Sequence, residues 1–261
     1  MTVKQCHHFH PLIVKHWGFE KIEKQLREVA EFINLNSRFR GTNRFPSLLK
    51  TFEMLPSRPG VAESGVSMPP MDDLRAYCNS GLPLGNASLK SEVERTGSKQ
   101  LADVLAWSLA VNEDIEHNMK AVPPFEYAAE SLEAISRLAD IVVVSQTPSE
   151  ALVREWHQHG INHLTRAIAG QELGTKAEHI RMAAGSKYER GRSLLIGDAL
   201  GDLAAARATG IPFYPVMPGH EVESWRLFKE EIMDKFFAGE YAGELENSLV
   251  EKFEKSLPDT M

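Results

Sequence analysis

Cysteines, long apolar runs and basic clusters are scarce in this 261-residue sequence. The two cysteines, Cys6 and Cys78, cannot build a disulfide framework, so a reducing compartment is expected. No apolar run approaches the roughly 20 residues that span a bilayer. The opening segment MTVKQCHHFHP also lacks the basic-then-apolar pattern of a signal peptide. These absences predict a cytoplasmic protein with no membrane partner.

Several catalytic signatures are missing as well. The chain contains no GxSxG, no P-loop and no GxGxxG motif, which argues against serine hydrolases, P-loop NTPases and Rossmann dehydrogenases. There is no lysine/arginine-rich run and the formal net charge is -7, so nucleic acid is not an expected partner. The acidic balance favours solubility and does not identify a substrate.

The residues that are present indicate an ordinary globular protein, with 43% hydrophobic and 25% charged residues. The length suits one large domain or one domain with a substantial insertion. Residues 1–120 are predicted to be helical. One amphipathic stripe there has apolar residues at three- and four-residue steps: Phe19, Ile22, Leu26, Val29, Ala30 and Ile33. Ser98 is predicted to cap a long helix with the buried face Leu101, Val104, Leu105, Ser108, Leu109 and Asn112.

The character of the sequence changes at AVPPF, residues 121–125, which is predicted to be a linker. Beyond it, expected strands at 141–144, 164–169, 193–196 and 211–214 alternate with helices. The apolar, β-branched run 141–144 is typical of a strand buried on both faces. This alternation predicts an α/β core over residues 121–218, with a parallel, doubly wound sheet. Residues 219–261 are expected to form closing helices that pack on this core.

Ser145 ends the first of these strands, in VVVSQTPSE. Thr147, Pro148 and Glu150 are predicted to cap the following helix, so Ser145 has no structural role visible in the sequence. A hydroxyl before a helix amino terminus suits one oxygen of a phosphate. The alternative is a turn serine that bonds its own backbone.

Lys176 lies at the first turn of a predicted helix, in GTKAEHI. A cation there opposes the helix macrodipole, at a cost of about half a kcal/mol in an exposed case. Placement against a local preference hints at a function. The alternative is a solvated lysine paired with Glu172 or Glu178.

Asp198 and Asp202 lie where a strand passes into a helix, within SLLIGDALGDLAAARATG. Two carboxylates at one corner repel each other unless a cation neutralises them. Mg²⁺ is the natural cation, because it binds a few carboxylates and keeps other positions for water and phosphate. The alternative is that Asp198 caps the helix and Asp202 is a favourable acid in its first turn.

The order of these segments, VVVSQTP, GTKAEH and IGDALGD, resembles the second, third and fourth motifs of the haloacid dehalogenase (HAD) superfamily. The resemblance covers about residues 121–217. It implies a HAD-like Rossmannoid core, with residues 1–120 as an all-helical cap domain.

The resemblance also implies roles and a reaction. Ser145, with Gln146 beside it, would hold a phosphoryl oxygen, and Lys176 would neutralise the phosphate and the nucleophile. Asp198 would bind Mg²⁺, with Asp202 beside it directly or through water. The implied function is Mg²⁺-dependent hydrolysis of a small phosphorylated molecule.

The family's first motif, DxDx(T/V), has no counterpart in this sequence. No aspartate occurs before Asp72, and Asp72–Asp73 follows two prolines rather than a strand. The first strand is central in the family's sheet, so its absence would leave two inner strands without a shared partner. An amino-terminally truncated form is the favoured explanation, because the residues of the other three motifs are all present. The alternative is a non-catalytic HAD-like scaffold that binds an anion or a protein partner.

Two other groups of residues are weaker candidates. Arg44, in the basic loop SRFRGTNRFP, could read a substrate phosphate, although a solvated basic turn is the alternative. A histidine group near the amino terminus could bind a transition metal, with Cys6 as the nearby thiol. Its members are His7, His8, His10 and His16.

Overall fold

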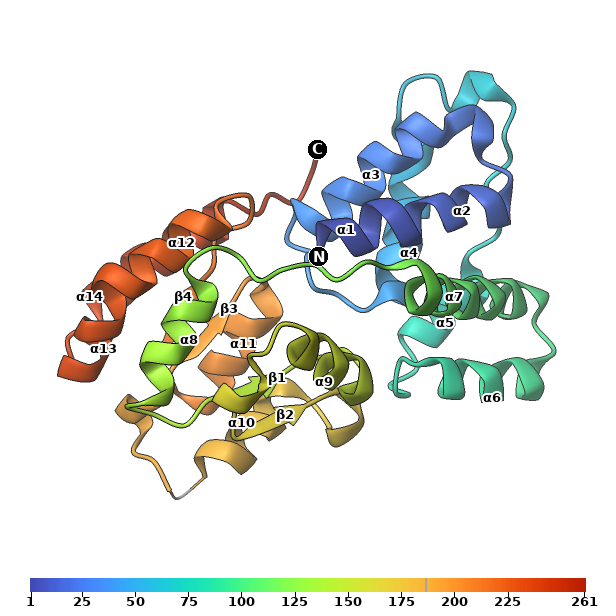
Figure 1. Ribbon diagram of the computed structural model, residues 1–261. Helices are drawn as coiled ribbons and strands as arrows, with labels where there is room; N and C mark the ends of the chain where they lie inside the picture. Colours follow the sequence, from blue (N-terminus) through green and yellow to red (C-terminus); the bar gives the residue numbers. More distant parts are fainter. Residues whose placement is uncertain (186) are drawn as a thin grey trace. The chain divides into compact units, whose positions relative to one another are not determined.

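The computed structural model describes residues 1–185 and 187–261. The side chains of Glu172 and Arg190 also lie outside the described set. The chain separates into two compact units (Figure 1). Unit 1 comprises Met1–Lys120 with Thr260–Met261, and unit 2 comprises Ala121–Asp259.

Unit 1 is helical throughout its regular structure. Its α-helices are α1 (Thr2–Lys4), α2 (His10–Trp17), α3 (Glu23–Leu35), α4 (Arg44–Met54), α5 (Asp72–Cys78), α6 (Asn86–Thr96) and α7 (Lys99–Asn118). A π-helical turn, η1 (Gln5–Phe9), joins α1 to α2. Short 3₁₀ turns are η2 (Glu20–Ile22), η3 (Leu55–Ser57) and η4 (Ala62–Ser64).

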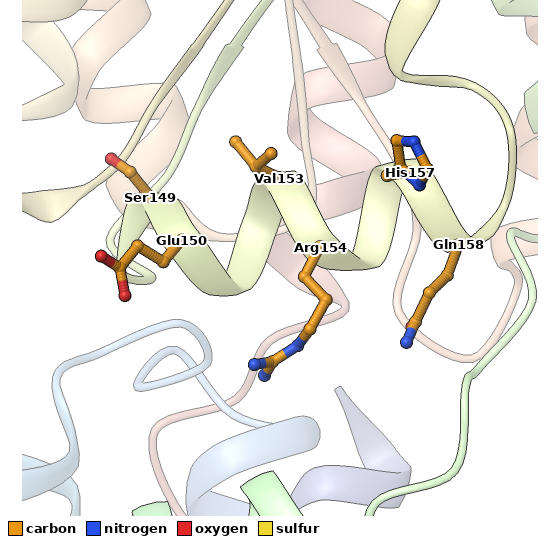
Figure 2. A pocket seen from close by; sticks show the side chains of 6 residues that line it. All are labelled: Ser149, Glu150, Val153, Arg154, His157 and Gln158. Atoms are coloured by element: carbon orange, nitrogen blue, oxygen red, sulfur yellow. The ribbon is translucent and has the colours of Figure 1, made fainter.

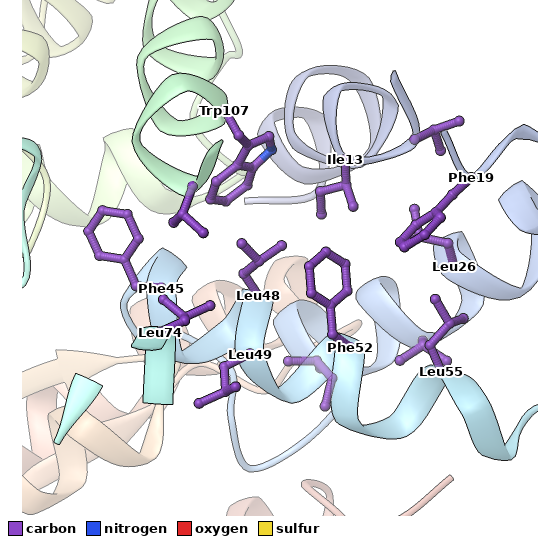
Figure 3. Close-up of a cluster of buried hydrophobic side chains, with 14 of the residues drawn as sticks. Ile13, Phe19, Leu26, Phe45, Leu48, Leu49, Phe52, Leu55, Leu74 and Trp107 are labelled. Atoms are coloured by element: carbon purple, nitrogen blue, oxygen red, sulfur yellow. The ribbon is translucent and has the colours of Figure 1, made fainter. Parts of the chain in front are cut away.

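An apolar cluster built from side chains on several helices holds unit 1 together (Figure 3). The predicted stripe of α3 and the segment before it is confirmed: Phe19, Ile22, Leu26, Val29, Ala30 and Ile33 are all 0% exposed. Aromatic edges fill the remaining space, with Phe52 in contact with both Trp17 and Phe19. Complete burial of each such side chain contributes about 1.5–3 kcal/mol.

Helix α7 begins as predicted but presents a rotated face to the core. Ser98 is its N-cap and accepts a hydrogen bond from the Leu101 amide. Leu109, predicted to be buried, is 51% exposed, while Trp107 and Val111 are buried in its place. The face turns toward Trp107 because this large indole packs against Phe9 and Trp17.

Unit 2 alternates helices and short strands. Its strands are β1 (Val142–Val144), β2 (Ala167–Ala169), β3 (Leu195–Gly197) and β4 (Phe213–Pro215). Its α-helices are α8 (Ala128–Ser136), α9 (Ser149–Gln158), α10 (Lys176–Ala184), α11 (Leu200–Thr209), α12 (Glu221–Leu227), α13 (Met233–Ala238) and α14 (Glu244–Lys255). The π-helical turn η8 (Phe228–Ile232) joins α12 to α13, and 3₁₀ turns are η5 (Asn162–Leu164), η6 (Gln171–Leu173) and η7 (Arg190–Arg192).

The four strands form two parallel pairs, where the sequence predicts one sheet. β1 pairs with β2 and β3 pairs with β4, with Val143 opposite Ile168 and Ile196 opposite Tyr214 (Figure 1). Unit 2 is therefore an α/β structure with two small parallel sheets. Within the described residues no strand lies against the second edge of β1 or of β3.

The prediction that 141–144 is buried on both faces is wrong, because every residue of β1 is only half-buried. A strand with one partner has fewer neighbours to cover it than a central strand has. β4, by contrast, is completely buried, since α14 packs on it and Phe253 contacts Phe213.

The outer edge of β4 is closed by side chains. The Phe213 amide donates to Glu246 Oε1 at 2.8 Å, and the Tyr241 hydroxyl donates to the Phe213 carbonyl at 2.6 Å. These bonds satisfy backbone groups that an edge strand otherwise leaves open. The closing segments thus seal one edge of the β3–β4 pair and leave its β3 edge without a described strand.

Among the described residues, no helix combines the length and the apolar character that a bilayer span requires.

Candidate functional site

The amino terminus of α10 lies beside the turn that joins β3 to α11, where the sequence predicts binding of Mg²⁺ and phosphate. We call this region, formed by the ends of β1 and β3 and the starts of α10 and α11, the corner. Thr175 is the N-cap of α10, accepting from the Glu178 amide, and Glu178 Oε2 in turn accepts from the Thr175 amide at 2.7 Å. These bonds also lower the pKa of Glu178. Because Glu178 is committed to this capping box, it is not the partner of Lys176. The other predicted partner, the Glu172 side chain, lies outside the described residues.

Lys176, the first residue of α10, forms an ion pair with Asp202 in the first turn of α11. The pair is largely removed from water, with the Lys176 side chain 21% exposed and the Asp202 side chain 8% exposed. Burial of a charge is costly unless the charge is paired and hydrogen-bonded. The unfavourable position of a lysine at a helix amino terminus is thus offset by a buried carboxylate.

The two oxygens of Asp202 have different partners. Oδ1 pairs with Lys176, whereas Oδ2 accepts from the amides of Asp198 and Ala199 at 3.2 and 3.1 Å. The carboxylate therefore fixes the turn that joins β3 to α11. Its negative charge also stabilises α11, because it lies at the positive end of the helix dipole. Asp202 is a structural centre of this corner.

Gly197 is required by the position of Asp202. A Cβ atom added at residue 197 would lie 2.5 Å from the Cβ of Asp202 and 2.7 Å from its Oδ2. Real Cβ atoms do not approach other heavy atoms so closely. Because glycine has no Cβ, the Asp202 carboxylate can pack directly against the end of β3.

Asp198 follows β3 directly and is half-buried. Its backbone amide is held by Asp202, so the direction of the chain at Asp198 is set by that bond. Asp198 is therefore the second carboxylate of the corner, and the turn that carries it is held by the hydrogen bonds of Asp202.

Ser145 and Gln146 continue from the end of β1. The Ser145 amide donates to the Ala169 carbonyl, which extends the β1–β2 ladder by one residue. The Ser145 hydroxyl accepts from the Thr147 amide at 3.1 Å, so the turn-serine alternative describes its local bond. The predicted cap of α9 is wrong: the helix begins one residue later, with Pro148 as N-cap and no side-chain cap.

Contacts link these segments into one corner of unit 2. The Gln146 side-chain amide donates to the Gly174 carbonyl at 3.5 Å, just before α10, and Lys176 then bridges α10 to α11. Helix α10 itself packs against both β1 and α11. The structure therefore connects the ends of β1 and β3 through the start of α10.

Arg44 lies in unit 1 and has a structural role there. Its Nη1 donates to the Ser108 carbonyl, the Ser108 hydroxyl and Asn112 Oδ1 at 2.8–3.1 Å, and its guanidinium lies over the Phe9 ring. Burial lowers the pKa of Arg44 to about 10. The bonds to Ser108 explain why this polar residue is buried, whereas the prediction that Asn112 lies on the buried face is wrong, because Asn112 is exposed. The alternative of a solvated basic turn holds only in part, because Arg38 is exposed whereas Arg40 is buried and donates to the Leu35 carbonyl.

The four candidate histidines are not gathered at one point. His8 bonds Asp114 at 2.6 Å, and His7 and His16 are exposed. Only His10 belongs to a possible metal cluster among the described residues, together with Cys6 and Glu31. Sequence reasoning missed Glu31 because it lies on a different helix; the four-residue spacing of Cys6 and His10 was the available signal.

A shallow pocket lies along one face of α9 (Figure 2). Its lining residues are Ser149, Glu150, Val153, Arg154, His157 and Gln158. None of them is a predicted site residue, and all come from a single helix. The pocket therefore adds nothing to the corner at Lys176.

Comparison with known proteins gives no match to a family model, a curated protein or a solved structure.

We expect Lys176→Met to lower the free energy of unfolding by about 3 kcal/mol, because it leaves Asp202 charged and buried without its cation. The matched control is Arg207→Met, which removes an exposed ion pair with Glu254 and should cost less than about 1 kcal/mol. Urea titration followed by circular dichroism measures both. Equal losses for the two variants would contradict the buried-pair assignment.

Gly197→Ala should lower the free energy of unfolding by about 1–3 kcal/mol, because the new methyl group overlaps Asp202. Gly201→Ala, four residues along in α11, meets nothing within 4 Å and should be neutral or stabilising by up to about 1 kcal/mol. Thermal unfolding of the two variants provides the comparison. A tolerated alanine at 197 would show that Asp202 does not occupy this position.

Proposed function

We propose that unit 2 is a haloacid dehalogenase-like core that binds Mg²⁺ and the phosphate of a small phosphorylated molecule. One observation carries the proposal: the buried Lys176–Asp202 pair sets the turn that presents Asp198 at the carboxyl end of β3. In open α/β sheets, ligands bind in the crevice outside the carboxyl ends of the strands. The residues that resemble the family's motifs therefore lie where this ligand chemistry is expected.

The division of the sheet supports the family assignment. A single strand inserted between β1 and β3 would join the two pairs into one five-stranded sheet. β4 would stay at one edge, in agreement with its closure by Glu246 and Tyr241. The inserted strand would occupy the central position that the first motif takes in the family.

Each residue has a defined role in this proposal. Lys176 supplies positive charge beside the phosphate, and Asp198 offers a carboxylate oxygen to Mg²⁺. The hydroxyl of Ser145 accepts from Thr147 and can donate its own proton to a phosphoryl oxygen. Gln146 would support the same oxygen from the end of β1. Asp202 is assigned to positioning, since both of its oxygens already have partners.

The donor set of the corner fits Mg²⁺. This ion binds through one or two carboxylates together with substrate phosphate and water, and Asp198 provides one such carboxylate. When bound, Mg²⁺ would stabilise the negative charge that develops on the phosphoryl group. The protein residues orient the phosphate and hold this charge in a partly dry corner.

The nucleophile of the family has no counterpart in the 261 residues. The earliest aspartates, Asp72 and Asp73, begin α5 in unit 1, and Asp73 accepts a hydrogen bond from Ser98. These residues therefore cannot be assigned the role of the first motif, and the corner is proposed as the electrostatic part of a phosphatase site.

The second candidate function is a non-catalytic scaffold that binds an anion. The missing nucleophile favours it, and Lys176 with Ser145 would suffice for anion binding. The two candidates differ in one respect, because only the phosphatase-type corner requires Asp198 and Mg²⁺ for tight phosphate binding.

We expect isothermal titration to show that Mg²⁺ strengthens the binding of inorganic phosphate at least tenfold. Asp198→Asn should remove this dependence because it deletes the anionic ligand. Ser145→Ala should weaken phosphate binding about fivefold to tenfold through the loss of one hydrogen bond. Asp234→Asn, which changes an exposed aspartate on α13, is the control. Phosphate affinity that is independent of Mg²⁺ and of Asp198 would favour the scaffold.

Residues 1–261 should show no Mg²⁺-dependent hydrolysis of an aryl phosphate above the buffer rate, because no aspartate is assigned as nucleophile. The release of the phenolate measures the reaction. Turnover that requires Mg²⁺ and disappears in Asp198→Ala would show that another residue of this chain serves as nucleophile.

A further inference from the structure

Three metal-binding side chains meet inside the helical unit, outside the corner described above. Cys6 lies on η1, His10 begins α2 and Glu31 lies on α3. One ligand atom from each, a sulfur, a ring nitrogen and a carboxylate oxygen, lies within 4.8 Å of the other two. We propose that Cys6, His10 and Glu31 bind a thiophilic divalent cation of the Zn²⁺ class.

His10 is the strongest indication of a ligand. It is 0% exposed, and neither ring nitrogen has a hydrogen-bond partner among the described residues. Buried polar atoms are nearly always bonded, so an unpartnered imidazole inside a helical core requires an explanation. A ring nitrogen without such a partner is available to bind a metal ion.

The local backbone presents Cys6 and His10 together. They are four residues apart, the spacing that places two ligands on one face of a zinc-binding helix. Between them the chain forms a π-turn, in which the His10 amide bonds the Gln5 carbonyl. Such turns are rare and occur often at functional sites. Glu31 then completes the group from the neighbouring helix.

The distances suit tetrahedral coordination after a small adjustment. Zinc bonds of about 2.0–2.3 Å separate neighbouring ligand atoms by about 3.5 Å. The ligand atoms of the three side chains lie within 4.8 Å of one another, so they have to move closer to bind zinc. Rotation of the Cys6 and Glu31 side chains can bring them together, since both are only half-buried. Their partial exposure also provides an entry path and room for a water molecule as fourth ligand.

The charges of the group favour a soft or borderline dication over Mg²⁺. A thiolate and a carboxylate would balance two positive charges, and sulfur with imidazole selects Zn²⁺-like ions. Arg27 lies nearby, donating to the Cys6 carbonyl, but its guanidinium is also bonded to Glu23. Binding would release the thiol proton to solvent as the metal–sulfur bond forms.

The test is titration of the tag-free full chain with Co²⁺ and Zn²⁺. We expect one equivalent of Co²⁺ to produce a thiolate-to-cobalt absorption band that one equivalent of Zn²⁺ removes. Zn²⁺ should also raise the thermal unfolding midpoint, because it binds the folded chain selectively. Mg²⁺ at the same concentration should leave the band unchanged, because a thiolate and an imidazole are poor ligands for this ion.

Near-isosteric variants identify the ligands. Cys6→Ser should abolish the absorption band, and Glu31→Gln should weaken Zn²⁺ binding at least tenfold. Cys78→Ser alters the other half-buried cysteine of unit 1 and should leave binding unchanged. Asp198→Asn should also have no effect, which separates this site from the corner in unit 2. Circular dichroism checks that each variant folds.

Two results would overturn the assignment. One is the failure of the unmodified chain to bind one equivalent of Zn²⁺ or Co²⁺. The other is a Cys6→Ser or Glu31→Gln variant that folds and binds as tightly as the unmodified chain.

Discussion

The arrangement of unit 2 depends on one buried ion pair, between Lys176 and Asp202. Asp202 holds the turn after β3 with one oxygen and receives the lysine with the other. Gly197 is required so that this carboxylate can lie over the end of the strand. A largely buried charge is stable only when such partners satisfy it. The pair therefore ties α10 to α11 and fixes the direction of the chain at Asp198.

The second constraint is the pairing of strands. β1 and β3 each have a single partner within the described residues, while the far edge of β4 is sealed by Glu246 and Tyr241. Hydrogen bonding along strands has to be completed on both sides of a central strand. The two halves of the predicted sheet are thus linked through α10 and the packed side chains around it rather than through a continuous ladder.

Unit 1 joins its helices through polar side chains as well as through its apolar cluster. Arg44 joins the start of α4 to α7 through Ser108 and Asn112, and His8 is bonded to Asp114. These groups are satisfied within the unit. His10 differs from them, since its two nitrogens have no hydrogen-bond partner among the described residues and it faces Cys6 and Glu31. That contrast is the basis of the proposed metal site.

Local patterns in the sequence determined the existence and type of most elements. The helical stripe from Phe19 to Ile33, the Ser98 cap and the four short strands all arise from residues that are close together in the chain. The tertiary structure decided the rest: the split into two sheets, the role of Asp202 as an anchor, the bonds of Arg44 to α7, and the meeting of Glu31 with Cys6 and His10. Periodicity reports which face of a segment is apolar, whereas these contacts join residues far apart in sequence and depend on how whole elements pack.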